Sequence, residues 1–145
     1  MNQFNLRVYA LIVNEKNEIL LSDEYEHGTF FTKFPGGGVE LGEGVLEALH
    51  RELKEELNLE VLNPTFFYFN EFCQQSGFNP NHQLVAFYYL IYCDSSNFKG
   101  QNYTIPFYSE GEKQRWVSIS TFSEKELTFQ VDRFAFLKLK DSKFT

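Results

Sequence analysis

The sequence has too few cysteines for a disulfide framework or a structural zinc site. Only Cys73 and Cys93 occur among the 145 residues, and their separation does not match a metal knuckle. We expect both thiols to be reduced and buried as small apolar groups in a cytoplasmic protein. Basic residues are also scarce: 13 Lys and Arg stand against 20 Asp and Glu, a formal net charge of −7. This balance disfavours binding to nucleic-acid backbones and to anionic membranes.

Long apolar runs are absent as well, so we expect no membrane-spanning segment, and the first residues lack the layout of a signal peptide. No internal repeat, low-complexity run or linker divides the chain. What the sequence does have is material for a core: 43 % of its residues are hydrophobic and 18 % are aromatic. We therefore expect one globular domain over residues 1–145.

Hydrophobic spacing predicts the order of the secondary structure. Helices are expected from about 44 to 57 and over 129–140, with a turn at 124–127 capped by Ser123 or Thr121. Polar loops are expected at 23–29, 74–81 and 94–108, and the last of these could shape a substrate cleft. The expected strands are Asn5–Val13, Glu18–Ser22, Phe30–Phe34, Val61–Cys73, Gln83–Cys93 and Lys113–Ile119. This order fits a mixed β-sheet between helices.

The first predicted helix follows a glycine loop and has two distinct faces. Its apolar face is formed by Val45, Ala48, Leu49 and Leu53. A second face carries Glu52, Glu55 and Glu56, whose spacing of three and four residues costs the helix roughly 0.2–0.5 kcal/mol per pair. A hard divalent cation such as Mg²⁺ or Mn²⁺ would turn this repulsion into binding. A solvated acidic face is the alternative.

The residues around this helix follow a longer pattern. Gly37 is followed by five residues, Glu43, seven residues, and then Arg51-Glu52-Leu53-Lys54-Glu55-Glu56-Leu57-Asn58-Leu59. This resembles the signature of the Nudix hydrolases, Gly-x5-Glu-x7-Arg-Glu-U-x-Glu-Glu-x-Gly-U, in which U is aliphatic. The one departure is Asn58 in place of the last glycine. That position caps the helix, where a left-handed backbone is common, and Asn tolerates this conformation.

The resemblance implies a fold and a reaction. The fold is a Nudix-type α/β/α sandwich with a mixed sheet over nearly the whole chain. The reaction is the Mg²⁺-dependent hydrolysis of a nucleoside diphosphate linked to another moiety, in which water attacks phosphorus. The implied substrate is a small nucleotide-type molecule, and its identity stays open, as does the choice between monomer and homodimer. A catalytically silent nucleotide sensor with the same fold is the alternative function, and a scaffold with a merely solvated helix is a third.

The resemblance also assigns roles to residues. The metal ligands that it implies are Glu52, Glu55, Glu56 and the backbone carbonyl of Gly36. Glu52 is the expected general base, and Glu55 is the second choice. Arg51 is expected to orient a glutamate or to form a structural ion pair with Glu43. Gly37 allows the backbone to approach the ion closely.

Further acids and substrate contacts are less well defined. Glu110 and Glu112 precede the Trp116 strand, where relatives of this kind often supply another acid; solvated loop carboxylates are the alternative. Lys33 could meet a phosphate oxygen, or it is a solvated strand lysine. Gln130 could read the edge of a base. The phenylalanines considered for stacking on a base are Phe31, Phe78 and Phe129.

Overall fold

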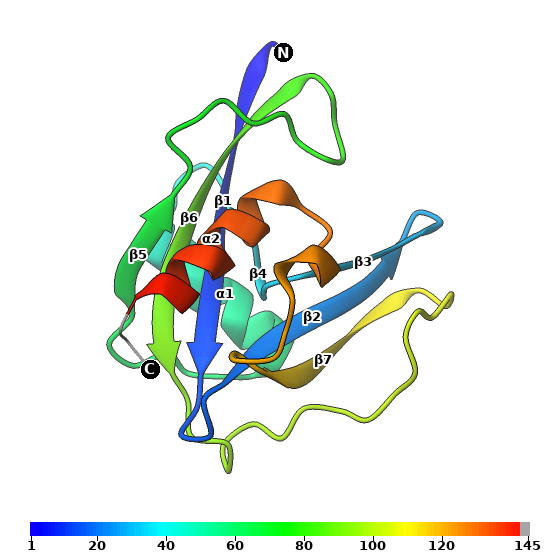
Figure 1. The fold of residues 1–145 in the computed structure, drawn as a ribbon. Helices are drawn as coiled ribbons and strands as arrows, with labels where there is room; N and C mark the ends of the chain where they lie inside the picture. Colours follow the sequence, from blue (N-terminus) through cyan, green and yellow to red (C-terminus); the bar gives the residue numbers. More distant parts are fainter. Residues whose placement is uncertain (143–145) are drawn as a thin grey trace. The chain divides into compact units, whose positions relative to one another are not determined.

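The structure, a computed structural model, describes residues 1–142 and divides into two compact units. The first unit contains residues 1–11 and 35–91, and the second contains residues 12–34 and the chain from residue 92 onward. The elements in chain order (Figure 1) are β1 (Gln3–Val13), β2 (Glu18–Glu26), β3 (Thr29–Lys33), β4 (Gly36–Gly38), α1 (Val45–Leu57), β5 (Thr65–Phe69), β6 (His82–Tyr92), β7 (Gly111–Ser118), the 3-10 turn η1 (Glu124–Glu126) and α2 (Gln130–Asp141).

The first unit is built around β1, whose residues 8–11 are almost entirely buried. β6 runs parallel to it, as the arrows in Figure 1 show, and Asn2 N donates to Asn81 O at 2.8 Å where the two strands begin. β5 pairs antiparallel with β6, and β4 pairs antiparallel with β1. Parallel and antiparallel pairs therefore occur together, which confirms the mixed sheet that the sequence predicts.

The glycine loop ahead of α1 is a short strand rather than a loop. Gly36 lies opposite Tyr9, and a Cβ added to Gly36 would lie 2.1 Å from Val8 O. Only a glycine allows the two backbones to approach this closely. The three glycines therefore form β4, which sets the position from which the chain enters α1.

The helix α1 forms where its periodicity predicts it. Its apolar residues are buried, while Glu47 in the first turn accepts a hydrogen bond from Gly44 N at 2.8 Å. The helix ends at Asn58, which has φ 51° and ψ 37° and donates from its backbone N–H to Lys54 O at 3.0 Å. Leu59 N donates to Leu53 O, which completes a Schellman-type end. The left-handed asparagine cap expected from the sequence is confirmed.

The strand predicted over Val61–Cys73 is wrong in length, since β5 covers only five residues. Asn63 has φ 51°, a left-handed conformation that precedes the strand. The buried side chain of Asn70 ends it by donating to Leu84 O at 2.9 Å and accepting from Ala86 N at 2.9 Å. The aromatic residues alone predict a longer strand. They give no sign that the side chain of Asn70 takes the place of the backbone in bonding to β6.

The second unit is built around β2, which pairs with β3 on one side and with β7 on the other. The prediction of a loop over 23–29 is wrong, because residues 23–26 continue β2. The turn is limited to His27 and Gly28, both with positive φ (51° and 77°), as two-residue hairpins require. The polar residues at 23–26 can lie in a strand because other groups form hydrogen bonds with their side chains. The carboxylate of Asp23, for example, is fully buried and accepts from Thr32 Oγ1 at 2.6 Å.

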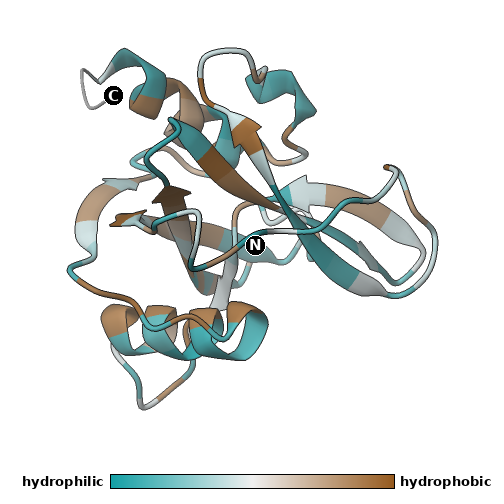
Figure 2. Cartoon of the chain, turned by 90° about the horizontal axis from the view of Figure 1, so that it is seen from below, coloured by the Kyte–Doolittle hydropathy of each residue, from teal (hydrophilic) through white to brown (hydrophobic). Residues whose placement is uncertain are grey.

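The end of the chain agrees with the prediction. Ser123 is the cap of η1, since its hydroxyl accepts from Lys125 N at 3.3 Å. In α2 the buried apolar residues recur at helical spacing, and Figure 2 shows hydrophobic and hydrophilic positions interspersed along both helices. Residues 93–110 form neither helix nor strand, as expected for most of that segment. Within residues 1–142, no helix is long and apolar enough to cross a membrane.

Both cysteines are free, as predicted. Cys93 is buried, and burial raises the pKa of its thiol. The prediction that Cys73 is buried is wrong: its side chain is exposed in the loop after β5.

Candidate active site

Arg51, in the middle of α1, is the centre of a charged network. Its guanidinium donates two hydrogen bonds to the carboxylate of Glu43, from Nη2 to Oε1 at 2.6 Å and from Nε to Oε2 at 3.0 Å. Nη2 also donates to Gly38 O at 3.0 Å, and Nη1 donates to Glu52 Oε1 at 3.0 Å. The planar fork of arginine suits such bidentate contacts. Arg51 therefore pairs with Glu43 and orients a glutamate at once, the two arrangements that the sequence left open.

The pair of Glu43 and Arg51 is charged at any ordinary pH. The two hydrogen bonds from Arg51 hold the pKa of Glu43 at about 2, below its ordinary value of 4.5. Glu43 in turn raises the pKa of Arg51, and Glu52 adds to this increase. The network thus supplies a fixed positive charge beside Glu52.

The carboxylate of Glu52 occupies space that Gly37 leaves open. A Cβ on Gly37 would lie 2.5 Å from Glu52 Oε1 and 2.7 Å from Oε2. Glu55 is different, because its side chain is 61 % exposed and its contact with Arg51 is long, at 3.5 Å. Glu56 lies one turn beyond Glu52 and is partly buried. Gly37 and Arg51 therefore position the carboxylate of Glu52, which is held more closely than that of Glu55.

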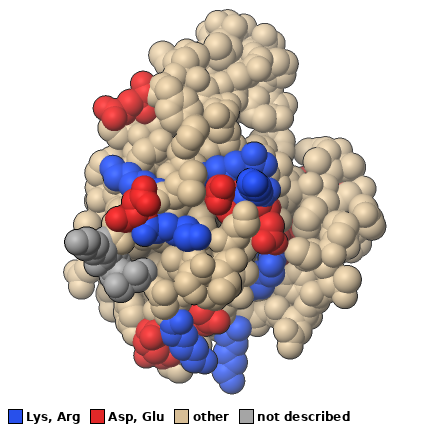
Figure 3. Space-filling model, viewed as in Figure 1, with Lys and Arg blue, Asp and Glu red and all other residues tan. Residues whose placement is uncertain are grey.

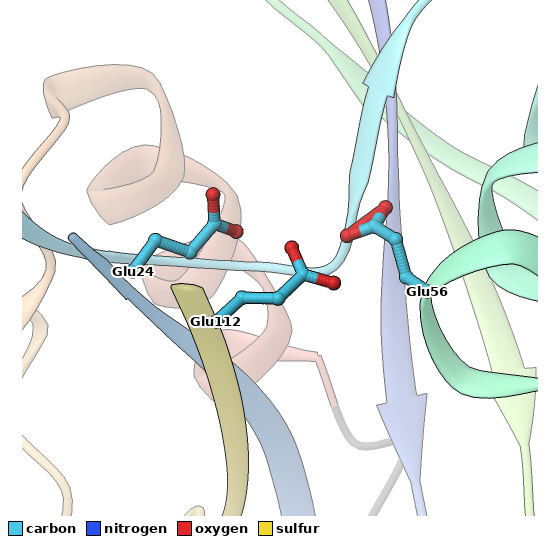
Figure 4. A group of neighbouring side chains, drawn as sticks. All are labelled: Glu24, Glu56 and Glu112. Atoms are coloured by element: carbon cyan, nitrogen blue, oxygen red, sulfur yellow. The ribbon is translucent and has the colours of Figure 1, made fainter. Parts of the chain in front are cut away.

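In the second unit, Glu24 and Glu112 lie directly opposite each other on β2 and β7. Their carboxylate oxygens are within 4.8 Å. Figure 4 shows these two side chains on adjacent strands and also draws Glu56 on α1. Glu24 is only 7 % exposed; it accepts from Ser22 Oγ at 2.9 Å and pairs with Lys33 Nζ at 3.2 Å. Two carboxylates this close are suited to share a cation.

The structure distinguishes the two acids that precede Trp116. Glu110 Oε1 accepts a hydrogen bond from His27 N at 3.2 Å, at the exposed tip of the β2–β3 hairpin. Glu112 lies in β7, opposite Glu24. Glu112 is therefore the better candidate for a metal ligand.

The predicted substrate contacts have very different surroundings. Phe31 is 1 % exposed and packs on Phe129, with 5.7 Å between ring centroids, so the expectation that it stacks on a base is corrected: it is a core residue. Lys33 is 4 % exposed, which excludes the solvated lysine. Gln130, in the first turn of α2, is exposed, as is Phe78 in the loop after β5.

The family model described as the NUDIX domain matches residues 3–138. The chain belongs to the Nudix family.

Two curated relatives and one solved structure characterise this Nudix chain further. An 8-oxo-dGTP diphosphatase of Haemophilus influenzae is 32 % identical over 110 residues, which are 74 % of this chain and 71 % of that protein. An RNA pyrophosphohydrolase of Hamiltonella defensa is 41 % identical over 56 residues, which are 39 % of this chain and only 33 % of that protein. A MutT structure, from work on Aliivibrio salmonicida and Vibrio cholerae, matches with a TM-score of 0.62 and 26 % identity, covering 94 % of this chain and 99 % of its own. The predicted Nudix-type sandwich is confirmed, and pyrophosphate hydrolysis is supported.

Sequence reasoning missed Glu24 because it lay in a stretch that was assigned to a loop. The available signal was the pair His27-Gly28, whose residues suit a tight hairpin between two strands. A hairpin at that point places Glu24 opposite Phe31 and continues β2 past Ser22. The Nudix signature itself does not include this region of the chain.

Proposed function

We propose that the chain hydrolyses the pyrophosphate bond of small nucleoside diphosphate-linked substrates with Mg²⁺ or Mn²⁺. The observation that carries the proposal is the network on α1, in which Arg51 holds Glu43 and Glu52 while Gly37 leaves room for the Glu52 carboxylate. The family and the diphosphatase and pyrophosphohydrolase names of the relatives support this reaction. In the proposal, residues 1–145 act as one catalytic domain on free nucleotides in the cytoplasm, not on nucleic acid or membrane.

The donor atoms fit a hard divalent ion. Glu52, Glu55 and Glu56 offer carboxylate oxygens from one side of α1, and the carbonyl of Gly36 offers a fourth. All are oxygen ligands, the type that Mg²⁺ and Mn²⁺ prefer. Once bound, the ion would neutralise phosphate charge and make the attacking water more acidic.

The chain's own residues then divide the remaining work. Glu52 is the proposed base that takes a proton from the attacking water, because Arg51 and the space at Gly37 fix its carboxylate. Glu55, more exposed and more loosely held, is the second choice. Arg51 is a positioning residue, since its donors are already bonded to Glu43, Glu52 and Gly38 O.

Of the two acids that precede Trp116, Glu112 is the proposed further catalytic acid, and Glu110 is not. The support is the register of β7, which places Glu112 opposite Glu24, whereas the carboxylate of Glu110 bonds to His27 N. Lys33 is a weaker candidate for binding phosphate, because it is already paired with Glu24. Phe129 and Gln130, where α2 begins, are the proposed contacts of the nucleoside.

A panel of nucleotides incubated with Mg²⁺ and assayed for phosphate or pyrophosphate release tests this proposal. It should include 8-oxo-dGTP, ordinary nucleoside triphosphates, nucleotide sugars and a 5′-triphosphorylated RNA. Release that depends on Mg²⁺ supports the enzyme. Binding of nucleotides without release would favour the sensor, and absence of metal binding would favour the scaffold. Glu112→Gln should lower turnover strongly, while Glu110→Gln should leave it close to that of the unmodified chain.

A further inference from the structure

A pocket of about 660 Å³ lies in the second unit, and neither Glu24 nor Glu112 lines it. Glu18 and Trp116 line it, and they are six and four residues from Glu24 and Glu112 along β2 and β7. At about 3.3 Å per residue, this separation is roughly 13–20 Å. The other lining residues come from the β1–β2 turn, from β7 and from the segment before it: Lys16, Ser95, Ser96, Lys99, Gln101, Asn102, Tyr103 and Arg115.

The walls of this pocket are held in place by partly buried hydrogen bonds. Asp23 accepts from Tyr103 Oη and from Arg115 Nε, both at 2.7 Å, and so fixes a ring and a guanidinium. The indole N–H of Trp116 donates to Phe98 O at 2.8 Å. Such contacts give a pocket that is formed before a ligand arrives, and its volume is within the usual range of small-molecule sites.

The segment 99–101 lies directly against the edge of β7. Gln101 N donates to Gln114 O at 2.8 Å, and the side chain of Gln101 accepts from Gln114 N. Gly100 has φ 72°, and a Cβ there would lie 3.3 Å from the same Gln114 oxygen. This part of the connection, which the sequence suggested could shape a cleft, is therefore a fixed wall.

The lining is basic although the chain is acidic. The lining contains three basic side chains, Lys16, Lys99 and Arg115, and a single carboxylate, Glu18, whereas the whole chain has a net charge of −7. Among the residues that the structure describes, neither lysine ammonium forms an ion pair, whereas Arg115 is paired with Asp23. Figure 3 shows basic and acidic groups together at the bottom of the view, around the β1–β2 turn and the start of segment 93–110.

The nearby acids are partly engaged by the protein itself. The carboxylate of Glu15 accepts from the backbone and hydroxyl of Ser95, and that of Asp94 accepts from the backbone and hydroxyl of Ser96. These bonds lower the pKa of each acid and direct it to a serine. The charge of Lys16 also lowers the pKa of Asp94, so Lys16 lies close to this acid, although neither Lys16 nor Lys99 forms an ion pair with it among the described residues.

We propose that this pocket binds a nucleoside monophosphate, at a site separate from the one that hydrolyses pyrophosphate. Lys16 and Lys99 would bind the phosphate, and Arg115, already paired with Asp23, also lines the pocket. The ring of Trp116 offers a face for the base, a contact that tolerates any base. The Nε2 amide of Gln101, whose oxygen already accepts from Gln114 N, can donate to the edge of the base, and the amide of Asn102 can donate or accept.

Trp116 is the only tryptophan in the chain, so its fluorescence reports directly on this pocket. The experiment titrates each probe into the full chain and records the tryptophan fluorescence. The chain carries Glu56→Gln and the buffer contains EDTA, which together remove metal-dependent binding at α1. Adenosine monophosphate, adenosine and inorganic phosphate are the three probes. The monophosphate should change the fluorescence saturably and bind at least about tenfold more tightly than either part alone, because charge-assisted contacts and stacking act together.

The double variant Lys16→Gln, Lys99→Gln should weaken binding of the monophosphate by about tenfold or more, as the loss of two charge-assisted contacts predicts. Lys125→Gln, an exposed lysine of η1, is the matched control and should not change it. No saturable change with any probe, or equal affinity in the double variant and the control, would overturn the proposal. Neither result would affect hydrolysis at α1, which is measured separately in the unmodified chain with Mg²⁺.

Discussion

Two of the glycines of β4, Gly36 and Gly37, should respond to alanine in different ways. In Gly36→Ala the new Cβ would lie 2.1 Å from Val8 O and 2.8 Å from Tyr9 Cα, with φ at +140°. Main-chain atoms cannot move aside without breaking the β1–β4 pairing, and the strained φ alone costs about 1–3 kcal/mol. We expect a total loss on the order of 3–5 kcal/mol, a large part of the stability of a typical domain.

In Gly37→Ala the three nearest atoms all belong to the carboxylate of Glu52, at 2.5–2.7 Å. The end of a side chain can rotate away, so the loss of stability should stay below about 1 kcal/mol. To reach ordinary contact at 3.4 Å, however, the carboxylate must move by nearly an ångström. Displacing a catalytic group by about 1 Å can lower the rate about 10²-fold.

Urea unfolding of both variants, together with Mg²⁺-dependent turnover, separates the two effects. We expect Gly36→Ala to be unstable and Gly37→Ala to be stable with low turnover. Wild-type turnover in Gly37→Ala would show that the position of the Glu52 carboxylate does not matter for the reaction. A Gly37→Ala variant as unstable as Gly36→Ala would show that the constraint at this position is in the backbone instead.

Three further outcomes are expected. Because the folded pKa of Glu43 is about 2, below its ordinary 4.5, the free energy of unfolding should fall as the pH drops from about 4.5 towards 2; Glu43→Gln should flatten this fall in unfolding curves, and an unchanged pH dependence would contradict it. Millimolar Mg²⁺ or Mn²⁺ should raise the melting temperature, since a ligand at 100 times its Kd adds roughly 2.7 kcal/mol; EDTA should reverse the shift, and Glu56→Gln should reduce it. Asn58→Gly should keep both stability and turnover, because glycine accepts the observed φ of 51°; loss of turnover in a folded variant would reveal a chemical role for Asn58.

The parts of the fold that local sequence determines were predicted well. The 3.6-residue spacing of apolar side chains located α1, and the tolerance of Asn58 for a left-handed backbone predicted its end. The Arg51–Glu43 pair was foreseen because both residues belong to one short pattern. In each case the interacting groups are close in sequence or repeat at a regular interval.

The parts that distant partners determine were not predicted. Asp23 is a strand residue only because Thr32, Tyr103 and Arg115 satisfy its carboxylate. Lys33 is buried because Glu24 lies across the β2–β3 pair, which no local pattern reveals. Cross-strand partners of this kind depend on the register of the paired strands. Turn residues indicate that register next to a hairpin, but the sequence gives no signal for the register between strands that are far apart in the chain.

The central claim is that the glutamates of α1 carry out a metal-dependent hydrolysis. Its most direct test compares Glu52→Gln and Glu56→Gln with Glu47→Gln, using the best substrate of the nucleotide panel and circular dichroism to confirm folding. Glu47 is a matched control on the same helix, and glutamine there keeps an oxygen that can accept from Gly44 N. Removal of a general base typically costs about 10²–10⁴-fold, and Glu56→Gln removes a proposed metal ligand, so both site variants should lose most turnover while the control stays close to the unmodified chain. If Glu52→Gln and Glu56→Gln turn over as fast as Glu47→Gln, the proposed site is wrong.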